Sequence, residues 1–468
     1  MGRTSRMHGR IRYERWTMTP PQLVSRKNRS IPRRILSGES GKDVMFKCGR
    51  DVRDWKAGNT MEVRIAKTAD PHVQSQPTYM FELLSKKVAN LNLVCREFGA
   101  RLCSGWSKNQ GEHALATTSN VRTQSQTKFR TWGRILCVTE DRLTTNTIML
   151  EGCKMSAHVN DFGTVQLDLS NVQSYSIFPG QLIAVEGTNP TGNSLVAERL
   201  FTSRHIPPCP KPKFEENLHI VVAAGPFTDR ENLDYQPLFD LMNSVAEAEP
   251  HVLILIGPFV SVNHPAIRNA TIHETFQELF ENIIEKVMKY IKGKCTQVVL
   301  VPSSNDAHHD PVYPTPEYFL PKFMQSPNLH LMTDPCMLDV EGLTIGMTSA
   351  DIIRHLSKEE MSRNMTGLDR LPRIVDHVLS QACFYPLYPP SNEMNVDTGL
   401  WEKYAMMYQR PHILLIPSDM HHLAKWLDDC LVINPERLKK RTYVRMIVRP
   451  SFDSTWSSDQ VDCEILKI

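Results

Sequence analysis

Two short segments of this sequence carry the residue types that bind metal ions. They hold Asp306, His308, His309 and Asp310 in the first, and Asp419, His421 and His422 in the second. Carboxylates and imidazoles are common metal ligands, and a pair of bound ions hydrolyses phosphate esters by clamping the attacking and leaving oxygens. A structural interpretation also fits: hydrogen bonds within a proline-flanked loop for the first segment, and a helix cap followed by surface histidines for the second. On the residues alone, we favour the structural interpretation for both.

Strand ends elsewhere in the chain would have to complete such a site. After a proline-rich bridge at 207–212, three short apolar runs end in turns at Ala224–Phe227, Ile256–Phe259 and Val301–Asp306. In an open α/β sheet, functional residues gather at the carboxyl ends of the strands, so these turns are expected at one edge. The sequence therefore predicts a layered α/β domain after the bridge.

Apolar runs and helical spacing define the elements expected in this domain. Strands are predicted at 218–224, 252–256, 297–301, 329–332, 343–346, 413–416, 442–448 and 461–467. Helices are predicted at 238–245, 272–292, 351–357, 371–381 and 420–428.

The preceding part of the chain changes from helical to alternating periodicity. Apolar residues recur every three or four positions over 80–103, which indicates an amphipathic helix, and the polar stretch Gly111–Lys128 indicates a linker. Five candidate strands with a period of two follow, at 132–138, 147–150, 164–169, 181–186 and 194–200. Five short strands separated by turn residues favour a small barrel of the OB type, with a fragment of a β-sandwich as the alternative.

Charge is distributed unevenly along the chain. Residues 1–36 contain ten Lys or Arg and one acid, Glu14, whereas the other 432 residues contain 44 bases and 50 acids. The basic head is compatible with a nuclear-import signal, a tail that contacts nucleic acid, a mitochondrial transit peptide or a weakly ordered terminus. The rest of the chain lacks the basic excess expected of a protein that binds duplex DNA.

Composition excludes other classes. The longest apolar stretches have about five residues, whereas a transmembrane helix needs about twenty, so no membrane span is expected. Eleven cysteines are spread singly without a CxxC pair. This spacing predicts reduced, mostly buried thiols of the cytosol or nucleus and no zinc finger.

The order of the strand-end turns resembles the calcineurin-like metallophosphoesterases, whose strand ends carry D-x-H, G-D and G-N-H-D. Gly225 and Phe227 stand where that family has Asp and His, and Pro258 stands where it has the bridging Asp. Ser303–Asp306 replaces G-N-H-D and retains only the final Asp, and Ser418–His422 lacks the G-H-x-H order. The resemblance therefore implies a phosphoesterase-like fold that has lost its dimetal centre.

Longer phrases are similar to the B-subunit family of the DNA polymerase alpha–primase complex. They are YSIFPGQLIAVEG from Tyr175, AAGPFT and LILIGPFV at two strand ends, VPSSNDAHHDPVYP (Val301–Pro314), GMTSADIIRHLSKEE (Gly346–Glu360), FYPLYPP (Phe384–Pro390) and LLIPSDMHHLAKWLDDCLVINPERL (Leu414–Leu438). The similarity is strong over 130–468 and weak over 75–130. It implies an OB barrel packed on an inactivated phosphoesterase-like domain, which together dock the C-terminal zinc-bearing domain of the catalytic polymerase subunit.

These observations predict four regions. They are a basic, largely disordered head (1–74), a helical segment and linker (75–130), an OB-fold domain (131–205) and an inactive phosphoesterase-like layered α/β domain (206–468). No catalytic, cofactor-binding or metal-binding residue and no cofactor are expected.

The resemblance implies a non-catalytic accessory subunit that acts in the nucleus at the initiation of DNA replication. Its expected partners are the catalytic subunit of polymerase alpha and, through the complex, the primase subunits, with DNA contacted mainly indirectly and no membrane. Two alternatives stay open. One is a divergent metal-dependent phosphoesterase that uses the two Asp/His segments. The other is a single-strand-binding OB protein, whose barrel region offers Trp132, Phe162, Tyr175, Phe178 and Phe201 for stacking on bases.

Overall fold

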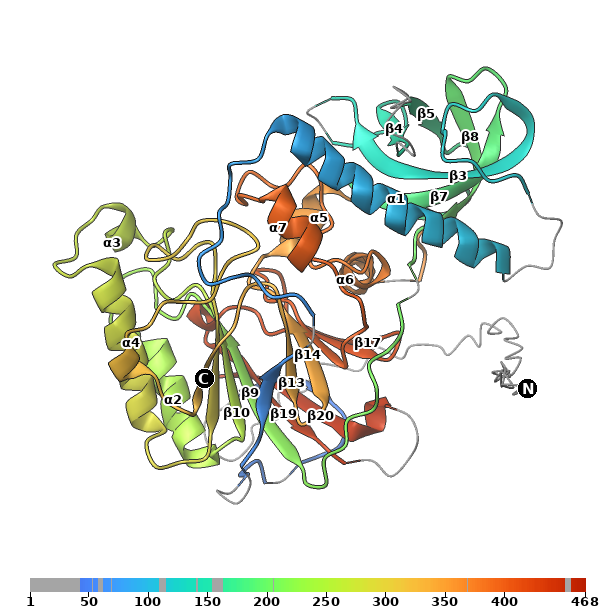
Figure 1. Ribbon diagram of the computed structural model, residues 1–468. Coiled ribbons are helices and arrows are strands. Elements are labelled where there is room, and N and C mark those ends of the chain that lie inside the picture. The colour runs from blue at the N-terminus through green and yellow to red at the C-terminus, as the bar shows by residue number, and fades with distance from the viewer. Residues whose placement is uncertain are drawn as a thin grey trace, which may run out of the picture. The chain divides into compact units, whose positions relative to one another are not determined.

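The computed structural model describes residues 43–468 except 53, 58–61, 69, 109–114, 140–141, 154–162, 205, 368 and 451–455. The basic head of the first 36 residues and Phe162 lie outside these described residues. The described part belongs to one compact unit. In it a β-barrel lies beside a larger domain of two sheets and several helices (Figure 1).

The barrel is built from the five strands that show a period of two. They are β3 (Ser125–Cys137), β4 (Ile148–Glu151), β5 (Thr164–Asp168), β8 (Ser194–Phe201) and β7 (Leu182–Asn189), in that spatial order. Successive side chains of a strand point to opposite faces, and residues such as Ile135, Leu150 and Leu167 fill the interior. Because β7 pairs back onto β3, the barrel is closed. Closure confirms the OB-type barrel and excludes the sandwich fragment.

The larger domain is organised around a seven-stranded mixed sheet. Its order is β1 (Asp43–Cys48), β20 (Val461–Lys467), β19 (Thr442–Val448), β9 (Leu218–Ala224), β10 (Val252–Ile256), β11 (Gln297–Val301) and β12 (Leu329–Leu331). The run from β9 to β12 is parallel. Parallel strands are usually covered on both faces, which agrees with the continuous apolar sequences of β9, β10 and β11.

A six-stranded sheet packs on the inner face of the first. Its order is β17 (Leu423–Leu427), β18 (Cys430–Asn434), β16 (Ile413–Leu415), β14 (Leu343–Met347), β13 (Cys336–Val340) and β2 (Ile65–Lys67). One buried cluster contains side chains of both sheets, among them Ile254 of β10 and Ile345 of β14. The two sheets therefore enclose a common core, and the predicted combination of a barrel with a layered α/β domain is confirmed.

Helices cover the outer faces of the two sheets. They are α2 (Gln236–Ala248), α3 (Pro265–Arg268), α4 (Phe276–Tyr290), α5 (Ile352–Glu359), α6 (Arg370–Ser380) and α7 (Thr398–Tyr404), with single 3-10 turns at Lys322–Met324, Leu438–Lys440 and Ser458–Gln460. The helices α2 and α4 pack on the seven-stranded sheet (Figure 1). The helix α4 begins at a capping box, in which Thr275 and Glu278 exchange hydrogen bonds. Its apolar stripe faces the sheet, as the sequence pattern predicts.

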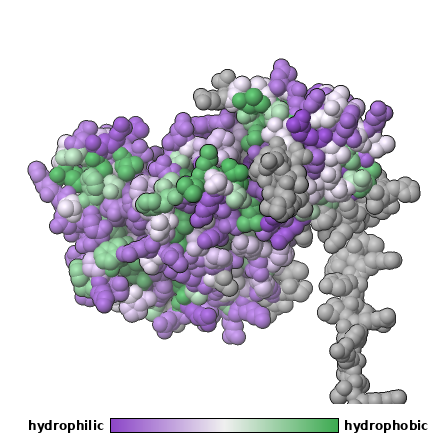
Figure 2. Space-filling model, turned by 45° about the horizontal axis from the view of Figure 1, so that its top comes forward, coloured by the Kyte–Doolittle hydropathy of each residue, from purple (hydrophilic) through white to green (hydrophobic). Residues whose placement is uncertain are grey.

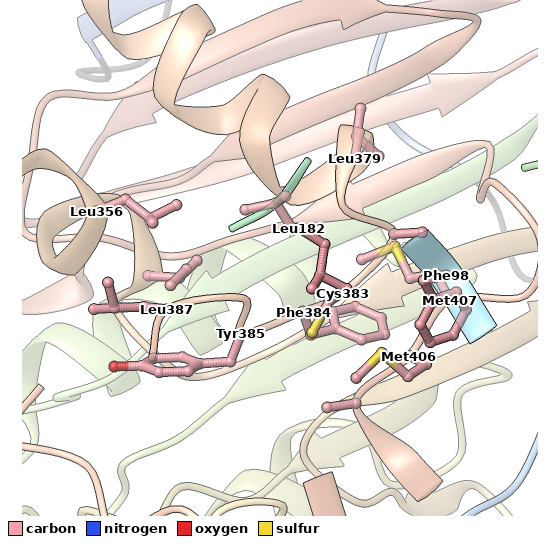
Figure 3. Packing of buried hydrophobic residues seen from close by; sticks show 14 of the residues in the cluster. Phe98, Leu182, Leu356, Leu379, Cys383, Phe384, Tyr385, Leu387, Met406 and Met407 are labelled. Carbon is pink, nitrogen blue, oxygen red and sulfur yellow. The ribbon is translucent and has the colours of Figure 1, made fainter. Parts of the chain in front are cut away.

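The long helix α1 (Leu84–Lys108) joins the barrel to the α/β domain. It contacts β3, β7 and β8 on one side and α7 on the other. A single buried cluster spans the junction, and Figure 3 shows Phe98 of α1 and Leu182 of β7 among side chains of the α/β domain that include Phe384 and Met407. Burial of these large side chains holds the helix, the barrel and the domain together.

A polar contact reinforces the same junction. The strand β6 (Tyr175–Ile177) leaves the barrel region and pairs with β15 (Met361–Arg363) of the α/β domain. Beside this pair, the Ser176 hydroxyl donates to the Glu360 carboxylate at 2.5 Å. Arg373 binds the same carboxylate with two hydrogen bonds of 2.6 and 3.1 Å. The buried Glu360 carboxylate thus accepts hydrogen bonds from Ser176 of the barrel region and from Arg373 of the α/β domain.

The predicted extent of the disordered head is wrong for its second half. The strand β1 pairs with β20 at the edge of one sheet, and β2 pairs with β13 at the edge of the other. Both strands are short and lie at the edges of their sheets, and each pairs with a segment far away in the sequence, so a local pattern does not predict them. The predicted linker is also too long, since β3 begins at Ser125.

The predicted helix at 420–428 is a strand. Leu423 and Leu427 are four positions apart, a spacing that suits a helix, but β17 forms a hairpin with β18. Asp428 and Asp429 form the turn with φ angles of 45° and 62°. Positive φ at both central residues is the geometry of the tight hairpin turns, in which Asp is tolerated. Asp419 therefore caps no helix.

Candidate functional site

The three strand ends singled out in the sequence meet at one edge of the seven-stranded sheet. Ala224 of β9 is opposite Ile256 of β10, which is opposite Val301 of β11. The turns that follow are tied to the neighbouring strands, since Gly225 N donates to Ile256 O at 2.7 Å and Gly257 N donates to Val301 O at 2.8 Å. This edge is where a metallophosphoesterase would hold its ions, and it is the candidate site.

The backbone is too close at this edge for a ligating side chain. A Cβ atom placed on Gly225 would lie 2.0 Å from Pro258 O, and one on Gly257 would lie 2.9 Å from the Asp306 carboxylate. Real Cβ atoms do not approach other heavy atoms so closely. The position that would carry the first metal-binding Asp therefore accepts only glycine here, unless the two turns separate.

Asp306 is committed to holding the turn after β10. Its Oδ1 accepts hydrogen bonds from Phe259 N at 2.6 Å and Val260 N at 2.7 Å, and its Oδ2 accepts one from the Tyr318 hydroxyl. The carboxyl is buried, and burial raises the pKa of Asp306 to about 7 although the hydrogen bonds act to lower it. Both oxygens of the Asp306 carboxylate thus accept hydrogen bonds from buried groups of the protein, as the structural interpretation predicts.

The side chains of the Asp306–Asp310 segment are engaged in contacts within the protein. The His308 ring stacks on Phe280 with 4.1 Å between centroids, and burial lowers the pKa of His308 to about 3. His309 Nε2 is 2.8 Å from Pro316 O, and the Asp310 carboxylate accepts from the Tyr79 hydroxyl at 2.9 Å. Asp306, His308 and His309 all contact Tyr318, and His308 Nδ1 is 3.9 Å from Asp306 Oδ1. Within the described ranges, no three His, Cys, Asp or Glu side chains are placed to share a metal ion.

The second Asp/His segment forms ion pairs with the turn after β18. Asp419 is 2.9 Å from Lys439 Nζ, and His422 Nδ1 is 3.1 Å from the Glu436 carboxylate. Ser418 donates to Asp351 at 2.5 Å. Asp419 and His422 therefore pair with residues of neighbouring loops and hold these loops together.

Arg437 lies buried at the candidate site and is not among the residues that the sequence pattern singles out. Its guanidinium donates to Gly225 O at 3.3 Å, Ser349 O at 3.3 Å and Pro417 O at 3.1 Å. These carbonyls follow β9, β14 and β16, so one side chain ties together strand ends from both sheets. Its charge acts to lower the pKa of buried Asp334, which burial nevertheless raises to about 6.

A buried guanidinium changes the electrostatics of this edge. A divalent cation placed beside it would be repelled, and the repulsion is strong where the surroundings are apolar. The strand ends are thus joined by a cation of the chain itself. Nothing local in the sequence marks Arg437, because an arginine after a strand is usually solvated.

Glu436 contributes stability that depends on pH. Burial acts to raise its pKa, but hydrogen bonds from His422 and contact with Lys440 outweigh burial and lower the pKa of Glu436 to about 2. A lowered carboxyl pKa stabilises the fold above the ordinary value of 4.5, and this contribution is lost as the pH falls toward 2. We expect Glu436→Gln to be less stable than the wild type by about 1–3 kcal/mol at pH 7, with a smaller difference at pH 3, as measured by urea unfolding. An equal difference at both pH values would contradict this assignment.

The described aromatic residues that the sequence offered for stacking on bases do not form a nucleic-acid surface, and a basic run near the end of the chain is neutralised by acids. The basic run after Glu436 is paired with acids at 2.6–3.1 Å: Lys439 with Asp419, Lys440 with Glu436, and Arg441 with Asp229 and Asp240. Trp132, Tyr175 and Phe178 are buried, and Phe201 packs partly against a core cluster. Stacking on single strands needs exposed rings in a basic groove, so these residues do not favour that alternative.

Apolar side chains are exposed at the start of α1. The exposed fractions are 50% for Met80, 84% for Phe81, 74% for Leu83, 77% for Leu84 and 40% for Val88. We call these five residues the α1 patch. On one face of the molecule, Figure 2 shows several separate hydrophobic areas. A groove of about 300 Å³ is lined by Phe81 and Leu83 of the patch, by neighbouring residues of the stretch 78–90, and by Asp397 and residues of α7. The apolar face of the helix predicted over 80–103 is expected to be buried. Leu91 and Val94 are buried, as this pattern predicts, whereas Leu83, Leu84 and Val88 are exposed.

Comparison with known proteins identifies the family. A model of the family described as the B subunit of DNA polymerase alpha/epsilon matches residues 220–425. A second model, of the OB domain of the DNA polymerase alpha B subunit, matches residues 106–203. The DNA polymerase alpha B subunit of Drosophila melanogaster is 39% identical over 311 residues, which are 65% of this chain and 50% of that protein. This chain belongs to the B-subunit family of DNA polymerase alpha.

Other members of the B-subunit family agree with this assignment. The mouse protein is 30% identical over 71% of this chain and 56% of its own length, and the Schizosaccharomyces pombe protein is 30% identical over 66% and 57%. The chain therefore spans about half the length of the curated relatives that it matches. An archaeal phosphodiesterase structure covers 49% of this chain with a TM-score of 0.23 and 9% identity, a likeness too weak to support an argument. No helix in the described ranges is long and apolar enough to cross a membrane.

Proposed function

We propose that this chain is a non-catalytic accessory subunit of the DNA polymerase alpha–primase complex in the nucleus. It holds the C-terminal domain of the catalytic polymerase subunit and, through the complex, the primase subunits. An RNA–DNA primer is then handed from one active site to the other at a raised local concentration. Arg437 carries the proposal: in a chain of the B-subunit family, its guanidinium occupies the edge where an enzyme of this fold would bind ions.

The α1 patch is proposed as part of the docking surface for the catalytic subunit. It comprises Leu84 and Val88 of α1 and three residues just before the helix, and α1 contacts both the barrel and α7, so a partner seated there lies beside the helix that joins both domains. Exposed apolar side chains of this number in nine residues are typical of interaction sites. Burying Phe81 or Leu84 against a partner would contribute about 1.5–3 kcal/mol each.

Assembly tests the proposal directly. The full chain is co-expressed with the C-terminal domain of the catalytic subunit, and the product is analysed by size-exclusion chromatography with mass and metal determination. We expect a 1:1 complex whose metal content equals that of the partner alone. A chain that elutes by itself after co-expression with a folded partner would overturn the docking role.

A separate measurement tests the absence of catalysis. We expect no hydrolysis of bis(4-nitrophenyl) phosphate above the buffer blank with Mn²⁺ or Zn²⁺, because Gly225 and Pro258 offer no ligand side chain and Arg437 repels cations. His309→Ala is expected to leave this background unchanged. A metal-dependent rate that disappears in His309→Ala would establish the divergent phosphoesterase instead.

A further inference from the structure

The strand β2 forms one edge of the six-stranded sheet. On its inner side, Thr68 N donates a hydrogen bond to Met337 O of the neighbouring strand β13 at 3.3 Å. The backbone groups of successive residues in a strand point to opposite sides, so the N–H and C=O groups of Ile65 and Lys67 point away from β13. Within the described residues, no segment on that side forms a backbone hydrogen bond with either residue. The edge therefore offers two donors and two acceptors to a further strand.

A groove of about 720 Å³ lies on the outer face of the sheet at this edge. Ala66 of β2, Asp339 of β13 and Thr344 of β14 are opposite one another in the sheet and line the groove. Leu338, next to Asp339, belongs to the core between the two sheets, and successive side chains alternate between faces. Lys67 also lines the groove, which places the groove at the edge of the sheet. A chain that pairs with β2 thus has room for side chains on this face.

The charges in the groove favour an acidic occupant. Three carboxylates line it, and each accepts a hydrogen bond within the chain: Asp70 from Thr68 Oγ1 at 3.2 Å, Asp339 from Gly342 N at 3.0 Å and Glu341 from Arg64 N at 2.6 Å. The side chains of Arg64 and Lys213 line the same groove and are exposed. Neither of these two cations forms an ion pair with another described residue. Both can therefore pair with carboxylates of a partner.

We propose that β2 and this groove bind an extended acidic segment of a partner protein, which adds one strand to the six-stranded sheet. Main-chain hydrogen bonds to Ile65 and Lys67 supply the pairing, as is general for β-strand addition. Acidic side chains on the groove face approach Arg64 and Lys213. Apolar side chains on the other face continue the row of Ile65, which packs partly against the core. The segment is therefore expected to alternate acidic and apolar residues, and its binding does not depend on the proposed function.

Fluorescence anisotropy with the full chain tests the site. The probe is a labelled synthetic peptide in which glutamate and valine alternate over eight residues, and a second peptide has lysine in place of each glutamate. We expect saturable binding of the glutamate peptide and at least about tenfold weaker binding of the lysine peptide. No saturable binding of the glutamate peptide, or equal binding of both, would overturn the proposal.

Methylated peptides separate strand pairing from simple charge attraction. One version of the glutamate peptide carries methyl groups on the backbone nitrogens of its glutamates, and another carries them on those of its valines. Only one of these two sets of N–H groups faces β2, because the N–H groups of a strand alternate in direction. We expect one version to bind about tenfold more weakly and the other to bind as the parent peptide does. Equal affinity of the two versions would contradict strand addition.

Charge-neutralising variants provide the controls on the protein. Arg64→Gln with Lys213→Gln is expected to weaken binding of the glutamate peptide about fivefold. Lys292→Gln with Lys425→Gln is the matched control, because both lysines are exposed and Lys425 lies on β17, at the opposite edge of the same sheet. We expect the control to change the affinity less than twofold, and thermal melts check that both double variants fold. Equal losses for the two would show attraction by the whole surface and would overturn the site.

Hydrogen exchange measured by mass spectrometry locates the bound strand. We expect the glutamate peptide to slow exchange at two amides of the segment 63–68, those of Ile65 and Lys67. Binding that leaves both amides unprotected would place the peptide elsewhere. Tighter binding of oligo(dT) that is lost in Arg64→Gln with Lys213→Gln would assign the groove to nucleic acid. A dimer of the full chain that protects the same amides without peptide would assign the edge to a second copy. Each of these three results would overturn the proposal.

Discussion

Replacing Arg437 with methionine lowers the free energy of unfolding by about 3–5 kcal/mol. Methionine fills most of the volume of the arginine side chain but donates no hydrogen bond. The carbonyls of Gly225, Ser349 and Pro417 then lose their charged donor in a buried place, and Asp334 loses a nearby positive charge. Urea unfolding followed by circular dichroism measures the loss.

Lys439→Met is the matched control for Arg437→Met, because it removes a cation two positions away. Lys439 forms one ion pair with Asp419, and the two side chains are 31% and 41% exposed. Exposed pairs of this kind contribute about 0–1 kcal/mol. Equal losses for the two variants would show that Arg437 does not hold the strand ends together, and a stable Arg437→Met protein that gains two metal ions would show that the site is a suppressed metal centre.

The double variant Phe81→Glu with Leu84→Glu binds the C-terminal domain of the catalytic subunit at least about 100-fold more weakly than the wild type. Two apolar side chains that are buried on binding contribute about 1.5–3 kcal/mol each, and about 1.4 kcal/mol corresponds to a factor of ten. Both side chains are largely exposed in the free chain, so its stability is expected to stay unchanged. Isothermal titration calorimetry gives the affinity, and a thermal melt checks the fold.

Phe319→Glu with Phe323→Glu is the matched control for the α1 patch. These rings are 72% and 83% exposed and lie outside α1, so removing them tests whether any exposed apolar pair is sufficient. We expect a change in affinity below twofold. If this control loses binding while the α1 double variant keeps it, the docking surface lies at Phe319 and Phe323 instead.

Elements with a complete apolar pattern could be predicted from the sequence, and short edge elements could not. The parallel strands β9 to β11 and the helix α4 each bury a continuous run or stripe, so their own residues carry the signal. The strands β1 and β2 form hydrogen bonds along one side only, with β20 and β13, which are far away in the sequence. Their conformation depends on a neighbour elsewhere in the chain, and a local pattern does not contain that neighbour.

The candidate site, too, could be predicted only in part from the sequence. Gly225, Pro258 and the loop ending at Asp306 could be placed together from the sequence, because consecutive parallel strands bring their ends to one edge. The inward role of Asp306 and the packing of His308 and His309 depend on Phe280, Tyr318 and Pro316, which come from other segments. The residue types alone therefore could not show whether these side chains would bind the same metal ion.

The sequence by itself determined the family, the barrel and the layered domain, and it placed Gly225 and Pro258, which offer no ligand side chain, at the strand ends, since each of these follows from residue types and their order. Only the tertiary structure decided which side chains fill the edge where the strands end and which apolar residues are exposed. Arg437 is a buried donor because strand ends from two sheets surround it, and Leu83 and Leu84 are exposed because α1 reaches the barrel only after its first turns. Burial is a property of the assembled fold: the same side chain is core or surface according to segments far away in the chain.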